Sequence, residues 1–156
     1  MSDLLPAIFT AIHAIGAVVW VGGMAFAHMV LRPSLLDSQP PERLAIWVKV
    51  FGRFFPLVWV SIVALLATGY HIVFAEFHGF DQTGVYIHVM HGIGLVMVAL
   101  FVFMFFVPYQ RLKAFVAGQD WKDAAGQLAL IRRVVTINLI LGLITVAVGS
   151  SGRFWG

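Results

Sequence analysis

The sequence has no cysteine and few charged residues, and both absences restrict what the protein can be. Its 156 residues include 10 lysines and arginines and 7 aspartates and glutamates. Without thiols the chain cannot form a disulfide, a thiolate metal site or a redox dithiol. Charged residues make up only 11% of the chain, whereas a soluble domain carries roughly 25%. An ordinary soluble domain is therefore excluded.

Apolar residues make up 61% of the chain and gather in four long runs. A membrane-spanning helix needs about 20 consecutive apolar residues. The runs predict spans over about residues 4–31, 54–77, 85–108 and 134–152. We therefore expect an all-α membrane protein, a single domain over residues 1–156 that forms an up-and-down bundle of four transmembrane helices in contact with the lipid bilayer.

Several residues mark where these helices begin and end. Arg32-Pro33 is predicted to end the first helix, and Gly118 to end an amphipathic extension of the third. Asp120 is a typical cap for the last helix. Polar amphipathic helical starts are expected at Arg43–Arg53 and Trp121–Arg133, before the second and fourth spans.

The basic residues lie almost entirely on one side of the predicted bundle. The connections 32–53 and 109–133 hold four and five of the 10 lysines and arginines, and Arg153 is the remaining one. Cytoplasmic loops of membrane proteins carry such an excess. The sequence thus predicts a multi-pass protein of the bacterial inner (plasma) membrane with loops 32–53 and 109–133 cytoplasmic and both termini periplasmic. Membrane orientation explains the net charge of +3 without a nucleic-acid partner.

The cores of the four apolar runs contain no Asp, Glu, Lys or Arg, and the ionisable groups that they do contain are histidines. An ionisable group in a membrane span usually faces the bundle interior or a ligand. At about 1.5 Å per residue, His13 lies roughly 14 Å below the outer end of its span, and His71 and His91 about 9 Å below theirs. His88 lies one turn closer to the outside. Histidines from three helices are thus expected at similar heights in the outer leaflet.

A b-type haem is the first ligand that suits this pattern, because it needs one or two imidazoles from facing helices. On the fourth helix, Asn138 and Gly142 belong to a small, polar stripe that allows close approach of a flat macrocycle. Trp20 is expected to wall the pocket, and Arg153 to lie near the propionates. His13 would be one axial ligand.

Copper is the second ligand that suits the pattern, since imidazoles and thioethers both bind it. Four histidines in the outer half of the spans are candidate metal ligands: His13, His71, His88 and His91. Met24, which precedes His28 by one turn, is a further candidate donor. Methionines also repeat every seven residues on the third span, at Met90, Met97 and Met104. Because methionine is a common core filler, packing is the favoured explanation of this stripe.

Four segments carry a resemblance to a known family. They are His13–Leu35, which contains a His…Trp-x-Gly-Gly pattern, Arg53–Tyr70, Phe106–Trp121, and Arg132–Arg153, which contains an Arg-Arg…Asn-Leu-x-Leu-Gly pattern. In this order they resemble the copper-resistance D (CopD) family of bacterial inner-membrane proteins. The resemblance implies a four-helix membrane domain and a role in copper uptake or handling.

A wider resemblance is to the HemJ type of protoporphyrinogen oxidase, which has four spans and is linked to haem b. By that resemblance, His13 matches the helix-one ligand and Asn138 the asparagine of the last helix. The chain departs from the family at Met24-Ala25-Phe26, where an aromatic run is usual. It also departs at His88 and His91, where that family has a lysine. These departures count against porphyrinogen oxidation but not against haem binding.

The favoured hypothesis is a b-haem protein for electron transfer or haem-linked redox chemistry, with His13 and either His71 or His91 as axial ligands. Its partners would be a quinone or quinol in the membrane and a periplasmic redox protein. The alternative is a copper-binding or copper-transport protein of the CopD type. A second alternative is a protoporphyrinogen oxidase-like enzyme or a structural accessory subunit. The sequence leaves the choice between haem and copper open, and a homodimer is compatible with so small a bundle.

Overall fold

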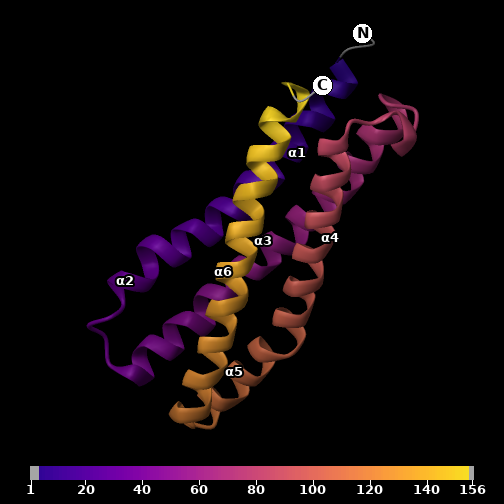
Figure 1. The fold of residues 1–156 in the computed structure, drawn as a ribbon. Helices are drawn as coiled ribbons and strands as arrows, with labels where there is room; N and C mark the ends of the chain where they lie inside the picture. The colour runs from indigo at the N-terminus through magenta and orange to yellow at the C-terminus, as the bar shows by residue number, and fades with distance from the viewer. Residues whose placement is uncertain (1–3, 155–156) are drawn as a thin grey trace.

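The computed structural model describes residues 4–154, and long helices make up most of this range (Figure 1). The α-helices are α1 (Leu4–Phe26), α2 (Arg32–Ser34), α3 (Pro40–Ala75), α4 (Val85–Phe106), α5 (Pro108–Ala117) and α6 (Trp121–Ser151). A π-helical segment, Ala27–Leu31, joins α1 to α2, and short 3-10 helices occupy Phe80–Gln82 and Gly152–Phe154.

Four helical stretches are long and apolar enough to cross a membrane. They are Leu4–Ser34, Pro40–Ala75, Val85–Ala117 and Trp121–Ser151. The prediction of an all-α, multi-pass membrane protein with four spans is confirmed. The second, third and fourth helices are longer than the apolar runs that predicted them, because amphipathic segments continue each of them beyond its run.

The predicted boundary residues lie close to the observed helix ends. Asp120 caps α6, since its Oδ1 accepts a hydrogen bond from the backbone N of Asp123 at 3.2 Å. Gly118 directly follows the end of α5. The first helix ends slightly later than expected, because the chain passes Arg32-Pro33 and stays helical to Ser34.

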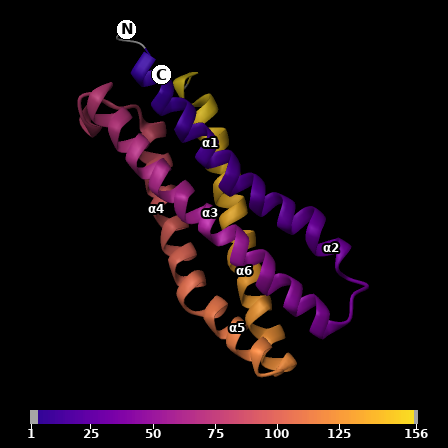
Figure 2. The same cartoon turned by 180° about the vertical axis from the view of Figure 1, so that it is seen from behind.

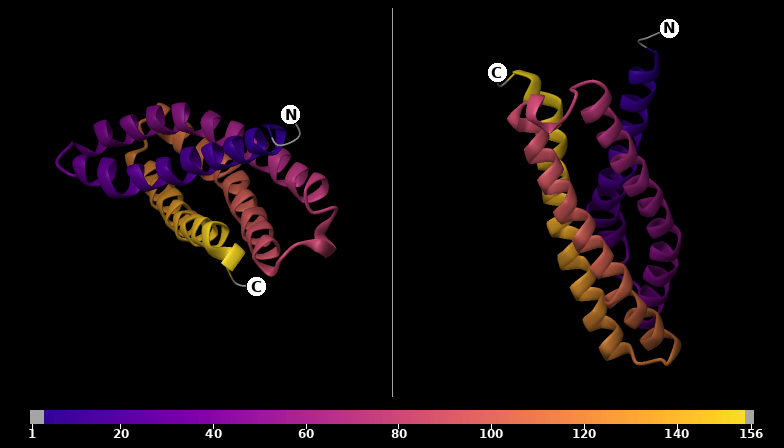
Figure 3. Two further views of the ribbon diagram at one scale, coloured as in Figure 1. Left: turned by 90° about the horizontal axis from the view of Figure 1, so that it is seen from above. Right: turned by 90° about the vertical axis from the view of Figure 1, so that its right-hand side faces the viewer.

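The helices pack as two antiparallel pairs, α1 with α3 and α4 with α6 (Figures 1 and 2). A side view shows α4 and α6 running together along one side of the molecule and α1 with α3 along the other (Figure 3). The start of α1, the 76–84 connector and the end of α6 lie at one end of the bundle, here called the terminal end. The α2–α3 and α5–α6 connections lie toward the other end, here called the basic end.

The buried core lies mainly in the half of the bundle toward the basic end. Its largest fully buried side chains include Phe55, Phe101, Leu112, Leu128 and Ile131. Phe55 packs edge-on against Phe101 with ring centroids 5.5 Å apart, which joins α3 to α4. The half toward the terminal end has fewer buried side chains, so the histidines there lie among partly exposed neighbours.

Candidate functional site

His13 extends from α1 onto α3. Its Nδ1 lies 2.9 Å from Thr68 Oγ1. Because the Thr68 hydroxyl donates to the carbonyl of Ala64 at 2.6 Å, it accepts the hydrogen bond from His13. A Cβ at Gly69 would lie 3.2 Å from His13 Cε1, so this glycine allows the imidazole to lie close to the α3 backbone.

His71 faces the same α1–α3 contact, one turn closer to the terminal end. Its imidazole stacks on the ring of Phe9, with centroids 3.8 Å apart and planes inclined by 23°. Phe9 precedes His13 by one helical turn, so both contacts lie on one face of α1. The two histidines are therefore at successive levels of a single interface.

His91 and His88 lie on the first two turns of α4. The Tyr70 hydroxyl is 3.0 Å from His91 Nε2, and Thr83 Oγ1 is 3.4 Å from His88 Nδ1. The Phe80 ring approaches both imidazoles, with centroids 5.8 Å from His88 and 5.0 Å from His91. These contacts place the two α4 imidazoles next to each other beside the 76–84 connector.

The predicted agreement in height is present, because His13, His71 and His91 all meet one turn of α3. His13 contacts Thr68, His91 contacts Tyr70, and His71 belongs to the same turn. At about 100° per residue, however, Thr68 and Tyr70 point roughly 160° apart around α3. His13 and His91 therefore contact different sides of α3, which separates them despite their common depth.

The histidines do not gather into one metal centre. Within residues 4–154, no group of three or more His, Asp or Glu side chains is placed to hold a metal ion. Two of the histidines, His88 and His91, both contact the Phe80 ring. A copper site here would therefore have these two imidazoles as its protein ligands.

Among the described residues, side chains pack closely around Trp20 and Gly142, where the porphyrin was expected. Trp20 is buried against the ring of Phe101, with centroids 6.2 Å apart. A Cβ at Gly142 would lie 2.8 Å from Val21 Cγ2 and 3.2 Å from Met97 Cε. The space expected for the macrocycle is thus filled by side chains. His13 is itself held against α3, so the haem prediction gains no support from this arrangement.

Asn138 has a packing contact in the middle of the bundle. It is fully buried, and its Nδ2 donates to the backbone carbonyl of Met97 at 3.1 Å, which joins α6 to α4. Its Oδ1 is buried and has no hydrogen-bond partner among the residues that the structure describes. The side chain of Arg153, predicted to meet a propionate, lies outside the described part of the chain.

The methionine stripe of α4 lies in the contact with α6. Met97 and Met104 are buried. Met90 covers Gly149, where an added Cβ would lie 2.7 Å from its Cε. The favoured explanation, that these side chains fill space between helices, agrees with these contacts.

Comparison with known families bears on the two chemistries that the sequence left open. The family model described as copper resistance protein D (CopD) matches residues 48–151, about two thirds of the chain. The chain belongs to the CopD family. The family is described by copper resistance, so this match is closer to the copper interpretation than to the haem interpretation. No curated protein and no solved structure matches the chain.

The CopD match begins after α1. It includes His71, His88 and His91 but not His13. The part of the chain that carries the family relationship therefore contains the adjacent imidazole pair of α4. His13, on which the haem hypothesis depended, lies outside that part.

Sequence reasoning missed the partners of the histidines. Thr68 precedes His71 by three residues, so helical periodicity would have placed both on one face. Tyr70 and Phe80 were not expected to contact His91, because the fold of the 76–84 connector cannot be read from periodicity. The contacts of these side chains determine which imidazoles are adjacent.

Proposed function

We propose that this CopD-family protein takes up or hands on copper ions at the terminal end of its bundle, in the bacterial inner membrane. The observation that carries the proposal is the pair of α4 imidazoles, His88 and His91, within the region matched by the family. By the charge distribution, this end faces the periplasm. The ion is cargo, which the protein binds and releases.

The chemistry of the pair suits copper. Imidazole is a good ligand for copper, and two imidazoles on adjacent turns of a helix can approach one ion together. Both rings lie beside the terminal end and not in the buried core, so an ion can reach them without the bundle unfolding. Phe80 limits the freedom of both rings and so favours a fixed pair.

Thioethers extend the set of soft donors toward the middle of the membrane. Met90 is adjacent to His91 in sequence, and Met97 and Met104 follow at intervals of about 10 Å along α4. Such intervals are too long for one ion to bridge. These methionines act mainly as packing residues. Copper enters at the histidines.

The experiment measures Cu(I) binding by the full chain in detergent, with ascorbate as reductant and a chromophoric Cu(I) chelator as competitor. We expect the double variant H88A/H91A to bind Cu(I) at least about tenfold more weakly than the unmodified protein, since it loses two ligands. The same proteins in liposomes would show whether binding leads to copper flux.

The matched control is H78N. His78 is exposed in the connector and has a φ of 59°, a conformation that asparagine tolerates. H78N should bind Cu(I) like the unmodified protein. Equal affinity of H88A/H91A and H78N would contradict the proposal, as would an unmodified protein that binds no Cu(I).

Haem binding, electron exchange with a quinol or periplasmic redox protein, porphyrinogen oxidation and a homodimer stay predictions of the sequence. A structural accessory role would leave both Cu(I) binding and flux absent, so the same experiment distinguishes it from copper handling.

A further inference from the structure

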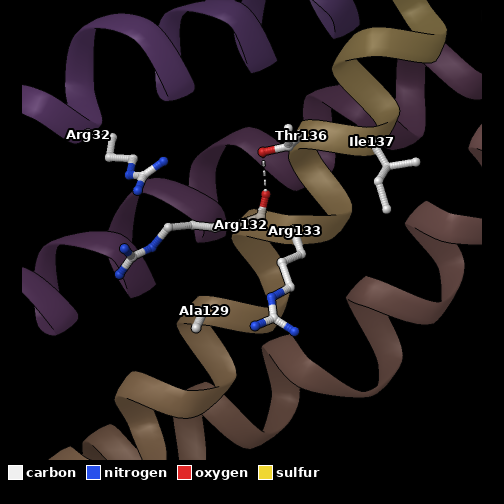
Figure 4. Close-up of a pocket in the computed structure, with 6 residues that line it drawn as sticks. All are labelled: Arg32, Ala129, Arg132, Arg133, Thr136 and Ile137. Carbon is white, nitrogen blue, oxygen red and sulfur yellow. Dashed lines mark hydrogen bonds between the residues drawn. The ribbon is translucent and has the colours of Figure 1, made fainter.

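A pocket of about 480 Å³ lies toward the basic end, between the end of the first membrane-crossing stretch and α6. Its volume is within the range of about 300–1,000 Å³ that is usual for ligand pockets. It is lined by Arg32, Ala129, Arg132, Arg133, Thr136 and Ile137 (Figure 4). Three of these six side chains are arginines, so the pocket concentrates positive charge.

The guanidinium groups of Arg32 and Arg132 extend into the space between their helices, whereas Arg133 leaves α6 in another direction (Figure 4). Within residues 4–154, no carboxylate forms an ion pair with any of the three. The positive charges of Arg32 and Arg43 act on Arg132. Like charges at close range repel, so this arrangement is unfavourable without an anion.

Arg132 also has an unused donor. Its Nε is buried and has no hydrogen-bond partner in the described part of the chain. A buried donor without an acceptor costs free energy, and a guanidinium loses most because it is charged. Nearby, Thr136 donates to the carbonyl of Arg132 at 2.8 Å and lies 3.4 Å from His28 Nδ1, which orders the wall of the pocket. The wall of the pocket is therefore ordered, and the Nε of Arg132 still lacks a hydrogen-bond acceptor.

The surroundings of the pocket fit a lipid. Arg133 is followed on the same face of α6 by Ile137, Ile140 and Ile144. All three isoleucines are exposed. They form an apolar track that runs from the pocket toward the middle of the membrane, where an acyl chain can lie.

We propose that this pocket binds the phosphate of an anionic phospholipid headgroup. Arg32 and Arg132 donate to the phosphate oxygens, and Arg133 adds charge at the rim. Guanidinium groups suit this role because their planar donors match phosphate geometry. The acyl chains lie along Ile137 and the two isoleucines beyond it. This binding does not depend on the handling of copper at the terminal end.

The experiment is native mass spectrometry of the full chain, purified in detergent and incubated with phosphatidylglycerol or with phosphatidylcholine. We expect the unmodified protein to retain phosphatidylglycerol in preference to phosphatidylcholine. R32Q and R132Q should each reduce retention by about tenfold, because each loses a charged hydrogen bond to phosphate. R132K should lose less, since it keeps the charge without the guanidinium donors.

R111Q is the matched control. Arg111 is an exposed arginine of α5 outside the pocket, so R111Q removes the same charge and should leave retention unchanged. Because Arg32 is exposed, R32Q also tests the site if R132Q does not fold.

Three outcomes would overturn the proposal. Equal losses in R111Q and R32Q would show attraction to overall surface charge only. Equal retention of both lipids would show no selectivity for an anion. Displacement of phosphatidylglycerol by an equal concentration of inorganic phosphate would assign the pocket to free phosphate and not to a lipid.

Discussion

The imidazole of His13 donates through Nδ1 to the hydroxyl of Thr68 at 2.9 Å, and this hydrogen bond joins α1 to α3. This hydrogen bond lies in the half of the bundle with few buried side chains. It therefore contributes a larger share of the α1–α3 contact there than it would in the core. The same bond occupies the nitrogen nearest to α3. His13 therefore serves the packing of the helices in this structure.

Replacement of Thr68 by valine tests this structural role. T68V keeps the side-chain shape but removes the acceptor of His13, so we expect a loss of roughly 1 kcal/mol in the free energy of unfolding. Thermal unfolding in detergent measures it. T145V is the control, because the Thr145 hydroxyl bonds only to the Leu141 carbonyl of its own helix. A T68V protein as stable as T145V would mean that the His13 contact stabilises nothing.

Replacement of Gly142 by alanine tests the close approach of three helices at mid-depth. The added methyl would lie 2.8 Å from Val21 Cγ2, on a short branched side chain that cannot move aside. We expect G142A to destabilise the bundle by about 1–3 kcal/mol in thermal unfolding. The control is G126A on the same helix, where nothing lies within 4 Å, and it should be neutral or up to about 1 kcal/mol more stable. Equal stability of the two variants would contradict the packing seen around Gly142.

The four spans could be predicted because apolar runs of this length have one stable solution in a bilayer, a helix with all backbone hydrogen bonds satisfied. The boundary residues were predictable for a local reason. Asp120 caps a helix through a bond to Asp123, three residues away. Such contacts depend on spacing along the chain, which the sequence shows directly.

The site was less predictable because it depends on the rotation of each helix. Similar depths were predicted for His13, His71 and His91, and the contacts of all three involve one turn of α3, but depth does not give the rotation of a helix. Only the packing shows that Thr68 and Tyr70 direct His13 and His91 to different sides. The arginine pocket was missed for a related reason. Arg32 and Arg132 were assigned to loops and used for orientation, although their depths relative to the spans already placed them near each other.

Absorption spectroscopy tests the haem hypothesis directly. Because the expected slot is filled around Trp20 and Gly142, we expect protein purified with ample haem supply to show no Soret band and no sharp α band after dithionite reduction. H13A should give the same spectrum. A Soret band that H13A abolishes would restore haem ligation by His13 and would show that the bundle opens around Val21 and Met97.

The contact between Tyr70 and His91 predicts that Y70F changes the Cu(I) affinity in the opposite direction to the histidine variants. The Tyr70 hydroxyl lies 3.0 Å from His91 Nε2, so a copper ion that binds this nitrogen has to displace it. Y70F removes the competing hydrogen bond, which is worth about 1 kcal/mol, and should therefore tighten Cu(I) binding by about fivefold. H91A should weaken it.

Chelator competition on the two purified variants measures both changes in Cu(I) affinity. The double variant Y70F/H91A completes a double-mutant cycle. If Y70F acts through His91, its gain disappears when His91 is absent. A gain that persists in the double variant would place the effect elsewhere. Weaker Cu(I) binding by Y70F alone would instead make the Tyr70 hydroxyl a supporting contact for the ion-bound imidazole, and His91 would then bind copper through Nδ1.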